Sequence, residues 1–310
     1  MIGFRPHRHM TLCIDQTYYG FVPYTYFPGD DGVYAIEAGE AIIYQVQNLA
    51  HNTFCALKVA KPSHRSEHIA RATEIAAAYK HVAGLFLGNR TCLTKTSHPQ
   101  LIAEYPDLEY AVLMPWLAGR TWASFMFDGA SSARYTRAQA YGLAVATVRV
   151  LWNLEASHLA HTDIAGGNVM LSPDLTQVEL LDIEGLYTHG ATMPKLRSQG
   201  SPGYQHRNLD HRGQWRPDGD RFAAAILLTE MLTWANPYVR ALTPDNAESL
   251  FQPKELQAST TRRLDAVRRA LAEICPPALA LFDQAWASVD LSQCPDFSTW
   301  AWTLIQASKL

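Results

Sequence analysis

Cysteine is scarce in this sequence, and the few present show no metal-binding or disulfide pattern. The 310 residues include five cysteines, and no two of them have the CxxC spacing. An odd count without that spacing argues against a disulfide framework and against a zinc site. We therefore expect buried free thiols and a reducing compartment. The five are Cys13, Cys55, Cys92, Cys275 and Cys294.

Strong charge and long hydrophobic runs are also missing. The formal net charge is −3, without a run of like charges, which excludes the basic surface of a dedicated nucleic-acid binder. The N-terminus lacks the apolar core of a signal peptide. The longest apolar run, FAAAILLTEML at 222–232, is too short to span a bilayer. These absences predict a cytoplasmic protein with neither a membrane nor a nucleic acid as partner.

The first part of the chain reads as a small sheet. With 48% hydrophobic and 18% charged residues, the chain has the composition of a packed globular protein, and its length suits two lobes. Residues 33–60 are rich in β-branched and aromatic residues, which predicts three antiparallel strands. A helix is expected over 64–82, and a strand from 110 that ends at Pro115. Residues 1–32 read as an irregular lead-in or an extra hairpin.

After Pro115 the pattern becomes helical. Segment 115–119 is typical of a hinge, and residues 182–217 lack periodicity, as a long functional loop would. We therefore predict an α+β fold of two lobes: a small antiparallel sheet lobe over 33–114 and a larger helical lobe over 120–310. Helices are expected at 136–158, 220–234, 260–274, 277–289 and 296–308, with short strands at 169–171 and 178–181.

Two segments carry most of the chemical information. HTDIAGGNVML at 161–171 places His161, Asp163 and Asn168 before a strand, and VELLDIEG at 178–185 ends a strand in Asp182. Phosphoryl transfer depends on positioning and charge neutralisation. Asn168 and Asp182 offer the hard oxygen ligands that Mg²⁺ prefers, which leaves Asp163 to deprotonate a hydroxyl. Either segment alone is also compatible with a simple turn; the two in this order favour the site.

This order resembles the catalytic and metal-binding segments of protein kinases. From about residue 33 onward, the chain looks most like a divergent bacterial serine/threonine kinase-like group, and the resemblance implies a bilobal kinase-like fold that uses ATP and Mg²⁺. ALKVAK at 56–61 resembles the strand whose lysine, here Lys58, binds the α- and β-phosphates. Its helix partner would be Glu74, preferred over Glu67.

The resemblance assigns four further roles. Gly39 would belong to the phosphate-binding loop, and Met114 would be the gatekeeper before the Pro115 carbonyl and the Leu117 amide that meet adenine. GSPGYQH at 200–206 resembles the end of an activation segment. There Ser201 would touch the catalytic Asp163. Asp220, which opens a buried helix, would bind the catalytic-loop backbone or simply cap the helix.

Several positions depart from the family pattern. Ala41 and Tyr44 stand where the other two loop glycines would fall, Thr162 replaces an arginine that reads activation-loop phosphorylation, and Ala165 replaces a lysine. Glu184 follows the metal-binding Asp182 and could bind a second metal or face solvent. The closing APE motif, which takes part in an ion pair, is replaced by residues 206–208.

Three functions therefore stay open. The first is a protein kinase that phosphorylates Ser/Thr hydroxyls of a protein substrate, including its own. The second is a pseudokinase that binds nucleotide or acts as a scaffold, which the missing glycines favour. The third is a small-molecule kinase of the aminoglycoside or choline type, because those enzymes share the H-x-D…N loop and often have an acidic residue after the metal-binding aspartate.

Overall fold

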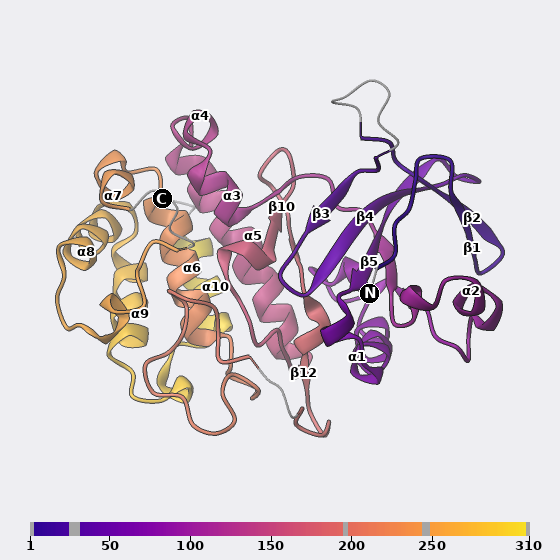
Figure 1. Ribbon diagram of the computed structural model, residues 1–310. Coiled ribbons are helices and arrows are strands. Elements are labelled where there is room, and N and C mark those ends of the chain that lie inside the picture. Colours follow the sequence, from indigo (N-terminus) through magenta and orange to yellow (C-terminus); the bar gives the residue numbers. More distant parts are fainter. Residues whose placement is uncertain (1–2, 25–31, 195–197, 244–248, 308–310) are drawn as a thin grey trace. The chain divides into compact units, whose positions relative to one another are not determined.

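The computed structural model describes residues 3–24, 32–194, 198–243 and 249–307 (Figure 1). The chain divides into two compact units. Unit 1 comprises Met1–His81 and Leu85–Leu117, and unit 2 comprises Val82–Gly84 and Ala118–Leu310. Unit 1 is dominated by antiparallel strands and unit 2 by helices, so the α+β class is confirmed. The division after Leu117 lies inside the segment 115–119 that the sequence predicts as a hinge.

The strands of unit 1 form one curled antiparallel sheet in the order β1-β2-β4-β5-β7-β6, and β3 also pairs with β4. The predicted strands within 33–60 are confirmed as β3, β4 and β5. β4 and β5 bury residues of the core, while all three residues of β3 are exposed. The described strands are β1 (Thr11–Ile14), β2 (Thr17–Phe21), β3 (Ala35–Glu37), β4 (Ala41–Asn48), β5 (Thr53–Ala60), β6 (Thr91–Cys92) and β7 (Val112–Pro115).

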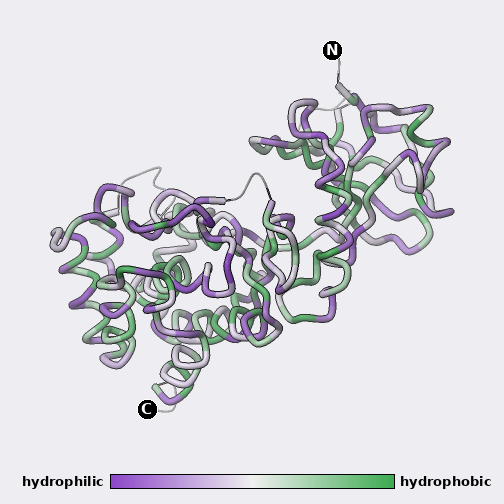
Figure 2. Tube along the Cα trace, turned by 90° about the horizontal axis from the view of Figure 1, so that it is seen from below, coloured by the Kyte–Doolittle hydropathy of each residue, from purple (hydrophilic) through white to green (hydrophobic). Residues whose placement is uncertain are grey.

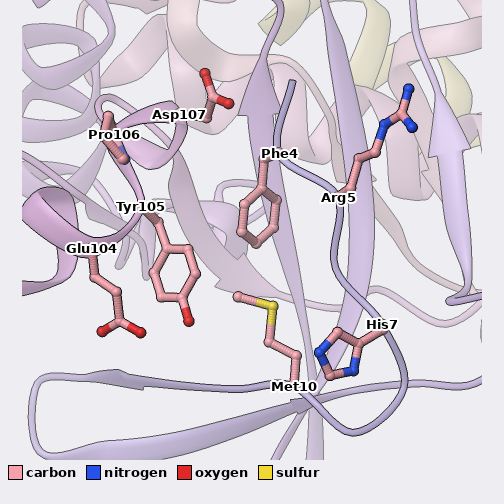
Figure 3. A pocket seen from close by; sticks show the side chains of 8 residues that line it. All are labelled: Phe4, Arg5, His7, Met10, Glu104, Tyr105, Pro106 and Asp107. Carbon is pink, nitrogen blue, oxygen red and sulfur yellow. The ribbon is translucent and has the colours of Figure 1, made fainter. Parts of the chain in front are cut away.

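The N-terminal residues form a hairpin that extends this sheet. Asp15 and Gln16 both have positive φ, 48° and 62°, as a two-residue turn between antiparallel strands requires. Strand β2 then pairs with β4, so the hairpin belongs to unit 1. Upstream of β1, Phe4 packs against Tyr105 at one wall of a pocket (Figure 3). Residues 25–31 of the expected lead-in lie outside the described residues.

The hydrophobic core of unit 1 lies on one face of the sheet. Tyr44, Leu57 and Leu113 are in register across β4, β5 and β7, and all three are buried. Ile102 and Leu108 pack into the same cluster. They come from α2 (Pro99–Glu104) and the 3-10 turn η3 (Pro106–Leu108). The remaining helix of unit 1, α1 (Glu67–Ala78), confirms the helix predicted at 64–82 and contacts β6 and the 3-10 turn Phe86–Gly88.

Unit 2 is built around α6, whose residues are buried on nearly all sides, as its continuous apolar sequence predicts. Helices α5, α8 and α9 contact it. The described helices are α3 (Trp122–Phe127), α4 (Gly129–Ser132), α5 (Arg137–Ala156), α6 (Arg221–Thr233), α7 (Pro237–Leu242), α8 (Arg262–Ile274), α9 (Pro276–Ala287) and α10 (Phe297–Ala307). The five helices expected from the sequence correspond to α5, α6, α8, α9 and α10, within two residues at each end.

Short strand pairs complete unit 2. β10 (Val169–Leu171) pairs with β11 (Val178–Leu180) and with β8 (Arg120–Thr121), and β9 (Leu159–Ala160) pairs with β12 (Tyr187–Thr188). The strands predicted at 169–171 and 178–181 are thus confirmed. Residues 82–84 also belong to this unit, where Leu180 N donates to Gly84 O at 2.9 Å. An added Cβ at Gly84, with φ +86°, would lie 2.2 Å from Val150.

An ion-pair cluster fixes the end of the long loop. Arg216, 8% exposed, donates to Asp218 from Nε at 2.6 Å and to Asp290 from Nη2 at 3.0 Å. The hydrogen bonds from Arg216 hold the pKa of Asp290 well below its usual range. Nearby, His206 Nε2 lies 3.0 Å from Ser288 Oγ. These contacts join the loop that lacks the APE motif to the segment between α9 and α10.

Hydrophobic and hydrophilic residues alternate at short intervals along the trace (Figure 2). Among the described helices, none is long and apolar enough to cross a membrane. All five cysteines are free thiols, and Cys275 and Cys294 are buried. The expectation of buried thiols is wrong for Cys13, which is exposed because it lies on the outward-facing side of β1.

Candidate active site

The predicted catalytic loop of unit 2 brings three sequence-predicted residues together. Ser201 Oγ donates to Asp163 Oδ1 at 2.9 Å. Asn168 Nδ2 donates to the Asp163 main-chain oxygen at 2.8 Å and lies 3.3 Å from Oδ2 of the same carboxylate. The Asp163 side chain is only half-buried. Oδ2 accepts only the longer bond, so a lone pair is left with which the positioned carboxylate can orient a hydroxyl and accept its proton.

Asp182 lies beside this loop. Leu181 N donates to Asn168 O at 2.9 Å, which places the following residue, Asp182, next to Asn168. Asp182 is exposed and has the left-handed conformation, with φ 49°, that aspartate tolerates better than most residues. Asn168 Oδ1 makes no hydrogen bond within the described parts of the chain. Its amide oxygen and the Asp182 carboxylate are a donor set that fits Mg²⁺, with water and phosphate as further ligands.

Asp220 binds the backbone of the predicted catalytic loop. Its carboxylate accepts from His161 N at 2.5 Å and from Thr162 N at 2.7 Å. Thr162 has φ 70°, a costly conformation for a β-branched residue. Burial raises the pKa of the Asp220 carboxyl, and His161 with the two N–H groups opposes this shift. Asp220 thus binds the loop at Thr162, where the backbone is strained. The Asp220 side chain makes no capping hydrogen bond to its own helix.

The side chains of His161 and Thr162 bind the loop to the segment around Asp182 through contacts with main-chain oxygens. His161 Nε2 lies 2.6 Å from Leu181 O, while its Nδ1 lies 3.3 Å from Asp163 N. A neutral ring protonated at Nε2 satisfies both contacts. Thr162 Oγ1 donates to Gly185 O at 2.8 Å. Thr162 therefore makes an internal contact with the 3-10 turn η5 (Ile183–Gly185). This turn also contains half-buried Glu184.

A buried carboxylate that sequence reasoning missed anchors the Ser201 segment. Glu230 of α6 accepts from Tyr204 Oη at 2.6 Å, from Trp122 Nε1 at 3.0 Å and from Leu250 N at 2.6 Å. Burial raises the pKa of Glu230 to about 7, although these three donors favour the ionised form. The signal in the sequence is a single acidic residue inside the otherwise apolar run at 222–232.

Replacing Glu230 by Gln should change how stability depends on pH. A carboxyl whose pKa is about 7 in the folded chain and 4.5 in the unfolded chain keeps its proton longer when folded. The free energy of unfolding of the unmodified protein should therefore fall as pH rises from 5 to 7, by roughly 1 kcal/mol per unit from this group. Glu230→Gln should lose that slope, as measured by urea unfolding at pH 5, 6 and 7.

The same variant should also be less stable at pH 5 by about 1–3 kcal/mol, because the hydroxyl oxygen of the protonated carboxyl can still accept a hydrogen bond and the amide nitrogen of glutamine cannot. Glu273→Gln, which changes an exposed carboxylate of α8, is the control and should follow the slope of the unmodified protein. Equal slopes in the unmodified protein and in Glu230→Gln would contradict the assignment.

In unit 1, Lys58 and Glu74 are on the same side of the sheet. Lys58 follows Leu57 in β5, so its side chain points away from the core face. Lys58, Val112 and Cys92 are in register across β5, β7 and β6 and share that face. Burial raises the pKa of the Cys92 thiol to about 11, and the nearby Glu74 carboxylate adds to the shift. Glu74 therefore lies over the face that carries Lys58.

Two other predicted residues of unit 1, Glu67 and Gly39, are exposed. Glu67, the alternative to Glu74, is exposed at the start of α1 and lies 4.0 Å from Arg71. Gly39 is exposed, has no positive φ, and an added Cβ would meet nothing within 4 Å. Nothing within the described chain therefore requires glycine there. Tyr44, at the position of a third loop glycine, is a core residue whose hydroxyl donates to Phe4 O at 3.2 Å.

Met114 lies in β7, and Leu117 is the last residue of unit 1. Met114 is buried, and Arg90 Nη2 lies 3.5 Å from its Sδ. Arg90 is itself buried and also donates from Nε to Leu87 O at 2.6 Å. This buried arginine beside the predicted gatekeeper is the second residue that sequence reasoning missed, since no motif marks it. Leu117 is half-buried.

Comparison with known proteins finds no family model that matches the chain and no curated protein that matches it in sequence. Among the described residues, no group of three or more His, Cys, Asp or Glu side chains lies close enough to hold a metal ion by itself. The functional interpretation therefore depends on the geometry around Asp163 and on the two oxygen donors beside it.

Proposed function

We propose that the chain is an ATP- and Mg²⁺-dependent kinase of a bilobal, protein kinase-like fold that transfers the γ-phosphate of ATP to Ser/Thr hydroxyls of a protein, including its own. The observation that carries the proposal is the contact of Ser201 Oγ and Asn168 Nδ2 with the Asp163 carboxylate, on a loop whose strained backbone is bound by Asp220.

Asp163 would act as the base. Its Oδ1 accepts from Ser201, which leaves Oδ2 to accept the proton of the attacking hydroxyl. The hydroxyl oxygen forms a bond to the γ-phosphorus while the bond from that phosphorus to the bridging oxygen breaks, and ADP leaves with the electron pair. Asn168 would keep the carboxylate oriented, because its Nδ2 donates both to the main-chain oxygen of Asp163 and to Oδ2.

Asn168 Oδ1 and Asp182 would hold Mg²⁺. When bound, the ion would neutralise negative charge on the phosphates. Lys58, oriented by Glu74, would bind the α- and β-phosphates. Gly39 would let the β3–β4 turn approach the phosphates. Met114 would line the adenine site, whose hydrogen-bonding groups would be the Pro115 carbonyl and the Leu117 amide. Ala165 supplies no cation for the γ-phosphate, so we expect slow turnover.

One observation favours a pseudokinase as the second candidate. The side chain of Tyr44 is buried in the core of unit 1. The backbone at this position therefore lacks the conformational freedom that a glycine would give to the preceding turn. A chain that binds nucleotide weakly or without turnover would fit this alternative, with Lys58 and Asp182 serving binding only.

Intact-mass spectrometry after incubation with Mg-ATP tests the proposal. The unmodified protein should gain mass in steps of one phosphate, and Asp182→Asn should gain none, because it lacks a metal ligand. Asp174→Asn, an exposed carboxylate on the β10–β11 turn, is the matched control and should behave like the unmodified protein. Isothermal titration with Mg-ATP should show weaker binding for both Lys58→Met and Asp182→Asn.

The outcomes separate the candidates. No added mass, together with nucleotide binding that depends on Lys58 and Asp182, would replace the kinase proposal by the pseudokinase. ATP consumption that requires an added small alcohol or amine, without protein labelling, would indicate a small-molecule kinase. Mass gain that persists in Asp182→Asn would overturn the assignment of this site.

A further inference from the structure

A cavity in unit 1 lies between the N-terminal segment and the end of α2, and none of its lining residues is assigned above to phosphoryl transfer (Figure 3). Its volume is about 340 Å³, within the range of small-molecule sites. One wall comes from the residues before β1, and the other from the end of α2 and the turn η3. The residues that matter for its chemistry are Phe4, Arg5, Met10, Glu104, Tyr105 and Asp107.

Two aromatic rings meet nearly at a right angle at this cavity. The centroids of the Phe4 and Tyr105 rings are 6.0 Å apart, and the ring planes are inclined by 86°. Both residues are partly exposed and line the cavity, so a ligand can reach them. Phe4 also packs edge to face on the buried Tyr44 at 5.9 Å, and Tyr44 Oη donates to Phe4 O at 3.2 Å. The core thus fixes the Phe4 ring before any ligand binds, which lowers the entropy cost of binding.

Glu104 brings an available negative charge to these rings. It is exposed at the end of α2, and it forms no ion pair with any residue that the structure describes. A hydrogen bond with the Glu104 carboxylate raises the pKa of Tyr105, so the Tyr105 hydroxyl stays protonated beside that carboxylate. Figure 3 shows the Glu104 carboxylate and the Tyr105 hydroxyl on the same side of the Phe4 ring. Aromatic faces and a carboxylate both attract a positive charge, so together they match an organic cation.

Neither Asp107 nor Arg5 neutralises Glu104. Arg65 already binds Asp107, because its Nη1 donates to Oδ1 at 2.6 Å. Arg5 is exposed, and Figure 3 shows its guanidinium directed away from Glu104 and Met10. The charge that a ligand meets beside the rings is therefore the negative charge of Glu104. Half-buried Met10 adds a polarisable thioether, which suits the methyl or methylene groups of such a ligand.

We propose that this cavity binds the ammonium group of a small organic cation, either a primary or a quaternary ammonium. The positive charge lies against the rings of Phe4 and Tyr105 and is balanced by Glu104. Met10 contacts the organic part of the ligand. All the lining residues belong to unit 1, so the proposal involves neither Asp163 nor Asp182 and does not depend on kinase activity.

Isothermal titration of the full chain at pH 8 with benzyltrimethylammonium, benzylamine and the neutral benzyl alcohol tests the proposal. At least one cation should bind, and benzyl alcohol should bind about fivefold more weakly or worse. Glu104→Gln should weaken the cation about fivefold or more and leave benzyl alcohol unaffected, because it removes only the charge. Glu104 is exposed, so this variant should fold as the unmodified protein does. Phe4→Leu keeps an apolar side chain without the ring, and it should weaken the cation by about two- to tenfold.

Two controls locate the binding. Glu109→Gln changes a carboxylate just after η3 that Lys95 already binds at 2.7 Å and that does not line the cavity, so it should leave affinity unchanged. Asp182→Asn should also leave it unchanged, which separates this site from the predicted metal site. Tighter binding of benzyltrimethylammonium identifies a quaternary ligand, and tighter binding of benzylamine a primary one. The proposal fails if neither cation binds at millimolar concentration, if benzyl alcohol binds as tightly as both, or if Glu104→Gln binds the cation as the unmodified protein does.

Discussion

Asp163→Asn should abolish most phosphoryl transfer while it leaves nucleotide binding nearly intact. In the unmodified chain, Ser201 Oγ lies 2.9 Å from Asp163 Oδ1. Asparagine has the same shape and can still accept from Ser201 through its Oδ1, but it cannot accept the proton of the hydroxyl. Loss of a general base lowers turnover by about 10²–10⁴-fold. The measurement is the rate of phosphate incorporation per chain, alongside the affinity for Mg-ATP from isothermal titration.

The two readouts distinguish loss of chemistry from loss of structure. Affinity for Mg-ATP should change by less than about threefold, because Asp163 is assigned no ligand role. Ser201→Ala is a useful companion: it removes the donor to Oδ1 and should reduce turnover less than Asp163→Asn, since the base itself stays. An Asp163→Asn protein with the turnover of the unmodified chain would remove Asp163 from the mechanism.

Asp220→Asn should destabilise the catalytic loop and lower turnover even though Asp220 touches no substrate in the proposed reaction. Its two carboxylate oxygens accept from His161 N and Thr162 N, and an asparagine has only one such oxygen. One buried N–H then loses its acceptor, at a cost of about 1–3 kcal/mol. The strained backbone of Thr162, at φ 70°, would also lose part of its restraint.

A double-mutant cycle tests whether that strain matters. Glycine adopts positive φ without penalty, so in a Thr162→Gly background Asp220→Asn should cost less stability than it does in the unmodified chain. Urea unfolding of the four proteins gives the coupling free energy directly. Equal costs in both backgrounds would show that Asp220 serves only as a hydrogen-bond acceptor, and that Thr162 needs no restraint.

The long elements were predictable because each follows a single strong pattern. The apolar run at 222–232 indicates a buried helix, α6, and β4 and β5 are eight-residue strands rich in β-branched, aromatic and other apolar residues. The strands β6, β8, β9 and β12 have two residues each, too short for any periodicity, so they were missed. The short helices α2, α3, α4 and α7 were also missed. The N-terminal hairpin was left open because its turn residues, Asp15 and Gln16, are not a common turn pair.

Some residues of the candidate site were likewise predictable from the sequence, and others were not. Asp163, Asn168 and Asp182 were readable from local spacing, and the contact of Ser201 with Asp163 came from the family resemblance. Glu230 stands out in the sequence as an acidic residue within an apolar run, but its partners were not predictable because they come from three distant segments. The role of residues 206–208 was also open. The structure shows them bound to the segment after α9, while the buried Arg216 forms an ion pair with half-buried Asp290.

That ion pair has a consequence for how the chain is made. Arg216 and Asp290 are 74 residues apart, so at about 5–20 residues per second the ribosome adds Asp290 roughly 4–15 s after the arginine. During that interval Asp218, two residues from Arg216, already balances its charge. The nascent chain can therefore begin to bury this arginine without a lone charge, and Asp290, in the segment between α9 and α10, later binds a guanidinium whose charge is already balanced.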